Sequence, residues 1–200
     1  MTEPLNPREI VSHLQLIQVH SKDFSDVPLA PLLRVFHELR KITSCLGVLF
    51  DMALNDITTK CVFIQAKTSA AGLDQATVGI VIVAEKQDNS LVTTPHETAT
   101  KKLLPLIRAL EFVAILLQNL NNQELGAAIR DAYWKTISRY HSYVVQAGVA
   151  TATYAAPYKQ QFFQQLGCTS PTEYCDELAP LLLGLYNGLK TLYIQEHCWQ

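Results

Sequence analysis

A few polar side chains lie in otherwise apolar segments, and their spacing indicates which of them could act together. Asp56 and Lys60 are four residues apart, so on a helix they share one face in the order that favours an ion pair. Lys101 and Arg108 are two helical turns apart and also share a face. His141 lies in SRYHSYVVQ, among apolar and aromatic neighbours. From spacing alone, the default interpretation is solvated helix charges for the four charged residues and a core position for the histidine.

The sequence lacks the common catalytic and cofactor-binding signatures. It contains no GxSxG, HExxH, P-loop or GxGxxG motif. His197 and Cys198 are adjacent, a spacing that rarely lets both side chains bind one metal, and the five cysteines form no CxxC pair. We therefore expect a protein that is not an enzyme, with no cofactor and no metal site. A hydrolase using Asp56 and His141 is the catalytic alternative, although no nucleophile motif accompanies them.

The composition indicates a folded protein with little surface charge. Of the 200 residues, 48% are apolar and 17% are charged, with a formal net charge of −2, whereas a typical domain has about 25% charged residues. This balance disfavours both disorder and nucleic-acid binding. No linker-like run divides the chain and no secretory signal is visible, so we expect one domain over residues 1–200 and a cytoplasmic protein.

The sequence predicts that the elements carrying these side chains are helices. Asn6, Pro7 and Glu9, and again Ser170, Pro171 and Glu173, have the pattern of a helix N-terminus. Apolar spacing predicts helices over about 7–19, 28–45, 47–65, 97–120, 123–155, 158–166 and 171–196. The β-branched run 76–86 would suit a strand, but no second strand could pair with it, so a buried helix is predicted. Residues 140–158 carry no charge and read as a buried helix followed by a turn. The fold class is all-α.

One segment resembles a known family. Residues 139–166 read RYHSYVVQAGVATATYAAPYKQQFFQQL, with Tyr140 and His141 ahead of an apolar stretch that ends in YAAPYK. This resembles the signature of the glycolipid transfer protein family. Two further segments fall in register, LGVLFDMALNDITTK at 46–60 and LIRALEF at 106–112. The resemblance covers roughly residues 25–195, and residues 1–24 lie outside it.

The resemblance implies a two-layer all-α sandwich with an apolar tunnel for lipid chains. The implied activity is transfer of sphingolipids between membranes without covalent chemistry. Asp56 would bind the sphingosine amide N–H and His141 the amide carbonyl. A lipid sensor with the same fold, which binds lipid but does not shuttle it, is the alternative, and an all-α adaptor without a ligand is a further one.

The resemblance leaves the head group open between sugar and phosphate. Glycolipid carriers of the family have an asparagine where this chain has Lys60, and a tryptophan where it has Pro105. A cation at the first position resembles the branch that carries ceramide-1-phosphate, in which Lys60, Lys101 and Arg108 would surround the phosphate. That branch also has an arginine where Pro105 stands. Proline inside a helix predicts a kink at this point.

The family register also implies residues for the chains and the membrane. Phe50, Phe112, Ile137 and Val149 would line the tunnel. Tyr143, Tyr158 and Lys159 would contact the membrane, where tyrosine suits the interface. The partners expected are therefore a glycosphingolipid or ceramide-1-phosphate and a transient membrane surface. We expect a monomer that is peripheral at membranes.

Overall fold

The computed structural model describes residues 7–22, 24, 26–47 and 50–199, and within them the chain is helical. The helices are α1 (Pro7–His20), α2 (Leu29–Ser44), α3 (Asp51–Ala70), α4 (Val78–Gln87), α5 (Ser90–Thr93), η2 (Pro95–Glu97), α6 (Ala99–Leu120), α7 (Leu125–Lys135), η3 (Ser138–Tyr140), α8 (Tyr143–Tyr154), α9 (Lys159–Gln165) and α10 (Pro171–Gln195). The only β-type pairing in the described ranges is an isolated bridge between Pro28 and Thr77. The all-α prediction is confirmed, including a helix rather than a strand over most of 76–86.

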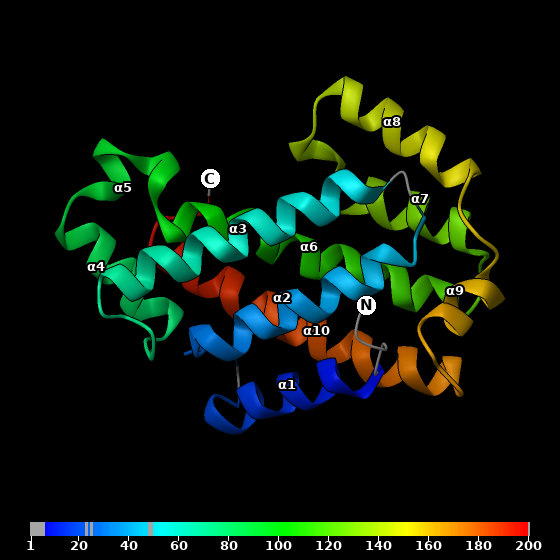
Figure 1. The fold of residues 1–200 in the computed structure, drawn as a ribbon, viewed down its shortest axis with the longest axis horizontal. Helices are drawn as coiled ribbons and strands as arrows, with labels where there is room; N and C mark the ends of the chain where they lie inside the picture. The colour runs from blue at the N-terminus through cyan, green and yellow to red at the C-terminus, as the bar shows by residue number, and fades with distance from the viewer. Residues whose placement is uncertain (1–6, 23, 25, 48–49, 200) are drawn as a thin grey trace.

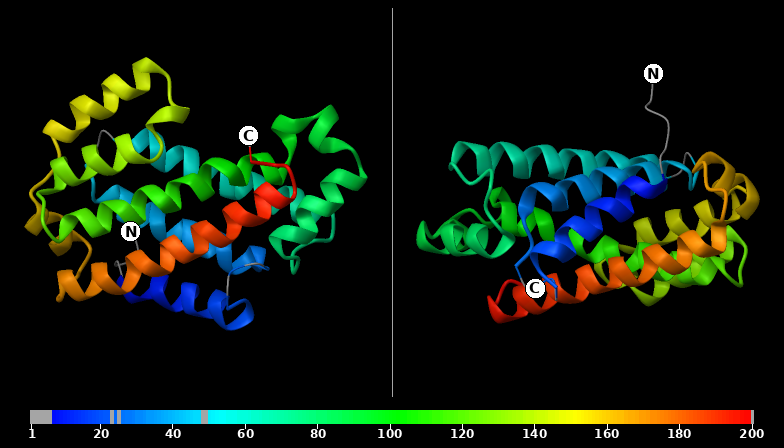
Figure 2. Two further views of the ribbon diagram at one scale, coloured as in Figure 1. Left: turned by 180° about the vertical axis from the view of Figure 1, so that it is seen from behind. Right: turned by 90° about the horizontal axis from the view of Figure 1, so that it is seen from below.

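The long helices form two layers. α1, α2 and α3 lie side by side in one layer, and α10, α6, α7 and α8 follow one another in the second. Contacts of α3 with α6 and of α1 with α10 join the two layers, as the view from below shows in Figure 2. The most extensive contact of all is between α6 and α10. The two-layer sandwich is therefore confirmed.

Helix α6 is the centre of the core. It is long and apolar enough by length and composition to cross a membrane, but 61% of its most apolar window is buried inside the protein. Its N-terminus is bound by a buried acid: the Glu85 carboxylate accepts hydrogen bonds from the backbone N–H groups of Ala99 at 2.6 Å and Thr100 at 3.0 Å. A carboxylate at this end also matches the helix dipole. Glu85 thereby fixes the start of the helix that carries Lys101 and Arg108.

The sequence predicts two capped helix N-termini, at Pro7 and at Pro171, and a kink at Pro105. α10 begins at Pro171 as predicted, but the Ser170 side chain makes no capping hydrogen bond; Asn6 lies outside the described residues. α6 continues through Pro105, which has no N–H to donate to the Lys101 carbonyl. The kink predicted at Pro105 stays a prediction.

The segment after α7 differs from the single long helix predicted for 123–155. The helix is interrupted between Lys135 and Tyr143, where η3 forms and His141 takes an extended backbone conformation. The prediction that 140–158 forms a buried helix is wrong: in α8 only Ala152 and Thr153 are buried. α8 lies at the edge of the second layer (Figure 1), so no neighbouring layer covers its apolar residues.

The C-terminal end of α8 touches α7 closely. A Cβ on Gly126 of α7 would lie 2.3 Å from the backbone oxygen of Thr153 in α8, which is closer than any side chain allows. Glycine at this position therefore permits the backbones of the two helices to approach each other.

Candidate functional site

The site predicted from the sequence forms around His141, which the break after α7 presents from a loop. The Oη of Tyr133 lies 2.9 Å from the Nδ1 of His141, and the two rings are 5.6 Å apart. Gln146, in the first turns of α8, donates from its Nε2 to the backbone oxygens of Ser138 and His141, both at 3.0 Å. Tyr133 thus orients the imidazole, and Gln146 fixes the loop that carries it.

Asp56 and Lys60 lie on α3 and form the ion pair that their spacing predicts. The Lys60 side chain is 18% exposed and that of Asp56 is 56% exposed, so the carboxylate is the more accessible partner. Burial lowers the pKa of His141, and the charge of Asp56 opposes this effect. Asp56, paired with Lys60, is therefore close enough to His141 for its charge to act on the imidazole.

Arg108 of α6 reaches the same region through an aromatic contact. Its guanidinium carbon lies 3.7 Å from the centroid of the Tyr140 ring and 5.3 Å from that of Trp199. Burial lowers the pKa of Arg108, and the charge of nearby Arg139 acts in the same direction. Arg108 thus contacts Tyr140, and Tyr140 is the residue immediately before His141 in the chain.

Lys101 stands two turns before Arg108 on the same face of α6, about 10 Å away along the axis. Its charge favours the thiolate of Cys198, which places it beside the C-terminal segment, although burial raises the pKa of that thiol overall. Lys101 is therefore a neighbour of the C-terminal segment, which also carries Trp199.

The structure adds residues that the sequence reasoning missed. Trp199 lies beside Tyr186 and Tyr193, with ring centroids 6.1 and 6.3 Å away, and Lys190 of α10 lies 5.9 Å from its ring. No sequence signal pointed to Trp199, because its position depends on where the last helix ends. Tyr133 and Gln146 were also missed, although both are within a few residues of the motif around His141.

The charges around Arg108 are unequal in number. Lys60, Lys101, Arg108, Arg139 and Lys190 are the cations. Asp56 pairs with Lys60, and Glu111 lies 4.0 Å from Arg139. Lys101 and Lys190 have no acidic partner among the described residues. Glu85 and Glu196 also act on Cys198 beside Lys101, and Glu196 pairs with Lys86. Cations still outnumber acids in this region, which is flanked by aromatic rings.

The residues predicted to line the lipid-chain tunnel are buried or half-buried, whereas the two tyrosines predicted to contact the membrane are exposed. Phe50 and Phe112 are buried, and Ile137 and Val149 are half-buried and pack against the core. Tyr143 and Tyr158 are 88% and 81% exposed. By contrast, the Lys159 ammonium donates to the backbone oxygen of Leu120 at 3.1 Å, so it holds α9 to the end of α6.

Comparison with known proteins identifies the family. A family model described as glycolipid transfer protein matches residues 27–168. The glycolipid transfer protein of Aureobasidium melanogenum is 32% identical over 182 residues, which cover 86% of this chain and 87% of that protein. The structure is similar to that of apo mouse ceramide-1-phosphate transfer protein, with a TM-score of 0.87, 20% identity and 98% of each chain covered. It is also similar to HET-C2, a fungal glycolipid transfer protein, with a TM-score of 0.74, 26% identity and coverage of 90% and 92%. The chain belongs to the glycolipid transfer protein family.

Proposed function

We propose that the protein transfers sphingolipids between membranes, with Asp56 and His141 binding the ceramide amide. The observation that carries this proposal is the proximity of an accessible carboxylate to a neutral imidazole fixed by Tyr133. An amide brings one donor and one acceptor, and leaving either unpaired in an apolar site costs about 1–3 kcal/mol. The two side chains supply both partners.

The contact with Tyr133 supports a specific role for the imidazole of His141. Burial raises the pKa of the Tyr133 phenol, so the hydroxyl keeps its proton and can donate to Nδ1 of His141. The proton of the neutral imidazole then lies on Nε2. This tautomer presents an N–H to the carbonyl of the lipid amide, while the Asp56 carboxylate accepts from the amide N–H.

The lipid chains present the larger energetic problem. At about 0.8 kcal/mol per methylene, exposing a chain of roughly 16 carbons to water costs on the order of 13 kcal/mol. We propose that Phe50, Phe112, Ile137 and Val149 shield the chains. α8 contributes few buried residues, so it can move away from the core at small cost in packing. Such shielding does not distinguish lipids, so selection falls to the head-group residues.

For the head group, the positive charge around Arg108 favours phosphate. Lys101, Arg108 and Lys190 would bind its oxygens in charge-assisted hydrogen bonds. Against this, the half-buried Trp199 ring offers a flat apolar surface on which a sugar could stack. The two head groups therefore depend on different side chains, and variants can separate them.

Membrane contact is proposed through the exposed aromatic residues of α8 and the turn after it. Tyr143 and Tyr158 are almost fully exposed and have the amphipathic character that suits a membrane interface. With a net charge of −2, the contact would depend on these apolar groups more than on charge. It would be weak and reversible, as a carrier requires.

The test is transfer of labelled galactosylceramide and labelled ceramide-1-phosphate between vesicles. Asp56→Val should abolish transfer of either lipid while the protein stays folded, because the amide N–H loses its acceptor. Asp26→Val, which removes an exposed carboxylate ahead of α2, is the matched control and should transfer normally. Undiminished transfer by Asp56→Val would remove Asp56 from the site, and transfer of neither lipid by the unmodified protein would overturn the proposal.

The same assay assigns the head group. If the cargo carries phosphate, Arg108→Gln should reduce transfer of ceramide-1-phosphate at least about tenfold, because charge-assisted hydrogen bonds are lost. If it carries sugar, Trp199→Ala should reduce transfer of galactosylceramide, and Arg108→Gln should have little effect on that lipid.

A further inference from the structure

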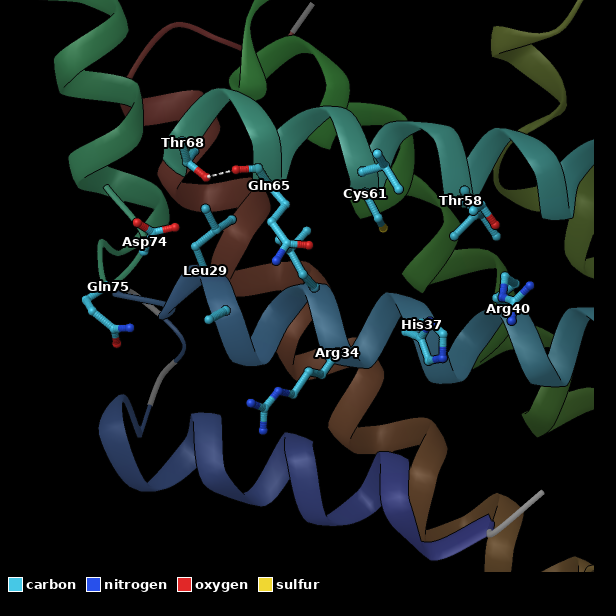
Figure 3. Close-up of a pocket in the computed structure, with 14 residues that line it drawn as sticks. Leu29, Arg34, His37, Arg40, Thr58, Cys61, Gln65, Thr68, Asp74 and Gln75 are labelled. Carbon is cyan, nitrogen blue, oxygen red and sulfur yellow. Dashed lines mark hydrogen bonds between the residues drawn. The ribbon is translucent and has the colours of Figure 1, made fainter. Parts of the chain in front are cut away.

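A groove separates α2 from α3, away from the residues discussed above. Its volume is about 640 Å³, within the range of small-molecule sites. It is lined by Leu29, Ala30, Leu33, Arg34, His37, Arg40, Ile57, Thr58, Cys61, Val62, Gln65, Thr68, Asp74 and Gln75. Figure 3 shows α2 forming one wall and α3 the other.

One wall carries an uncompensated set of basic side chains. Arg34, His37 and Arg40 are three residues apart on α2, and none forms an ion pair with another described residue. The Nε of Arg40 is buried without a hydrogen-bond partner. A buried donor without a hydrogen-bond partner costs free energy. A ligand that supplies an acceptor to this atom would therefore be stabilised. In Figure 3 Arg40 lies in the gap below Thr58, His37 faces the viewer, and Arg34 extends from α2 away from α3, toward α1.

The opposite wall is mostly uncharged. Ile57 and Cys61 are half-buried on α3, and Leu33 packs near them from α2. Burial raises the pKa of the Cys61 thiol to about 11, so it stays protonated and uncharged near neutral pH. The one acid of the lining, Asp74, lies at the far end and accepts a hydrogen bond from Ser69. The groove thus combines a basic wall on α2 with a mostly apolar wall on α3.

The groove and the amide site use different faces of α3. At about 100° per residue, Lys60 lies about 40° from Asp56 around the helix, whereas Cys61 and Gln65 lie about 140° and 180° from it. A ligand in the groove therefore has no access to Asp56 or His141 from its side of the helix. Occupation of one site does not require the other.

We propose that this groove binds a phosphate ester, with the phosphate accepting hydrogen bonds from Arg40 and His37. Its carbon atoms would lie on Leu33, Ile57 and Cys61, and Arg34 would close over the outer side by changing rotamer. A phosphate has enough acceptor oxygens to satisfy the Arg40 Nε and both other basic side chains. Both soluble phosphate esters and phospholipid head groups carry this chemistry, and binding measurements distinguish them.

The test uses the full chain in two binding measurements. Titration calorimetry with glycerol 3-phosphate detects a soluble ester. Sedimentation with phosphatidylcholine vesicles, with and without phosphatidic acid, detects a lipid head group. Binding in the first measurement assigns a soluble ester, and binding only to vesicles that contain phosphatidic acid assigns a membrane lipid.

Variants connect either result to the groove. Arg40→Gln should weaken binding at least about tenfold, because two or more charge-assisted hydrogen bonds are lost. Arg130→Gln, at an exposed position on α7, is the charge-matched control and should bind as the unmodified chain does. Arg40→Lys keeps the charge but not the fork of donors and should recover part of the affinity.

Two outcomes would overturn the groove proposal: no binding to either probe, or equal binding by Arg40→Gln and Arg130→Gln in proteins with unchanged melting temperatures. The result is independent of the sphingolipid proposal. Arg40→Gln should transfer sphingolipid normally between neutral phosphatidylcholine vesicles, and Asp56→Val should bind the phosphate probe normally.

Discussion

At the scale of single residues, the proposed amide site depends on a histidine that is neutral in the folded protein. Burial holds the pKa of His141 below its ordinary value, and the nearby Asp56 only partly offsets this. The imidazole therefore presents one N–H and one acceptor nitrogen near neutral pH, rather than two donors. In the proposed arrangement the Tyr133 hydroxyl donates to Nδ1, which leaves the N–H on Nε2.

The lowered pKa predicts how stability depends on pH. The unfolded chain takes up a proton on His141 at about pH 6.5, whereas the folded chain resists it. The stabilising contribution is therefore fully present above about pH 6.5 and is lost as the pH falls through the folded pKa. Melting temperatures measured from about pH 8 to pH 5 should fall less steeply for His141→Gln than for the unmodified protein. Parallel curves would contradict a depressed pKa at His141.

Tyr133→Phe tests the orientation of the imidazole. Removal of the hydroxyl leaves Nδ1 without its partner, so both tautomers become populated and transfer should fall severalfold. The loss of one hydrogen bond should lower the free energy of unfolding by only about 0.5–1.5 kcal/mol. Vesicle transfer and urea unfolding measure the two effects. Thr93→Val, which removes an exposed hydroxyl from α5, is the control, and an equal loss of transfer in both variants would contradict the role of Tyr133.

At the scale of the elements, α8 is the helix whose apolar sequence is least matched by burial in the structure. It is among the most apolar segments of the chain, yet Val144 is 82% exposed and Tyr143 is almost fully so. A membrane would cover these residues where the protein does not. The position of α8 at the edge of its layer makes such contact possible without rearrangement of the core.

We expect replacement of these exposed residues to affect membrane contact and not folding. Tyr143→Ser combined with Val144→Ser should reduce binding to phosphatidylcholine vesicles and slow lipid transfer, because apolar area is lost from the contact. The melting temperature should change little, since neither side chain is buried. Val19→Ser, at an exposed position on α1, is the matched control and should bind vesicles normally. Unchanged vesicle binding by the double variant would exclude this face.

Most helices could be predicted from local signals, and the exceptions have physical causes. Proline at 7 and 171 and apolar spacing over 28–45 locate helices because these signals act within one or two turns. The break at 136–142 has no proline or glycine to indicate it. The burial of α8 was predicted wrongly because hydrophobicity indicates a need for cover, not which neighbour supplies it.

At the scale of the whole molecule, the candidate site joins α3, α6, the loop before α8 and the C-terminal segment. Asp56, Arg108 and His141 could be assigned from the sequence only through the resemblance to a family, because spacing alone suggested ordinary helix charges. Trp199 and Lys190 could not be assigned, since only the packing of α10 against α6 brings them to Arg108.

A cargo that binds between these elements should stabilise the folded chain as a whole. A ligand present at 100 times its dissociation constant adds about 2.7 kcal/mol to the free energy of unfolding. Adding the transferred sphingolipid in detergent should therefore raise the melting temperature, by differential scanning calorimetry, for the unmodified protein and for Asp26→Val. Asp56→Val should show a smaller increase. Equal increases in Asp56→Val and Asp26→Val would indicate that lipid stabilises the fold without the amide site.

The close approach at Gly126 has a consequence for how cargo leaves. Because the backbone oxygen of Thr153 rests against Gly126, the C-terminal end of α8 is fixed on α7 and would act as a hinge. At the other end, Gln146 bonds α8 to the loop that carries His141. A rotation of α8 about Gly126 would therefore displace the loop that carries His141. In the proposed mechanism, the same movement would expose the lipid chains and break the hydrogen bond between His141 and the lipid amide.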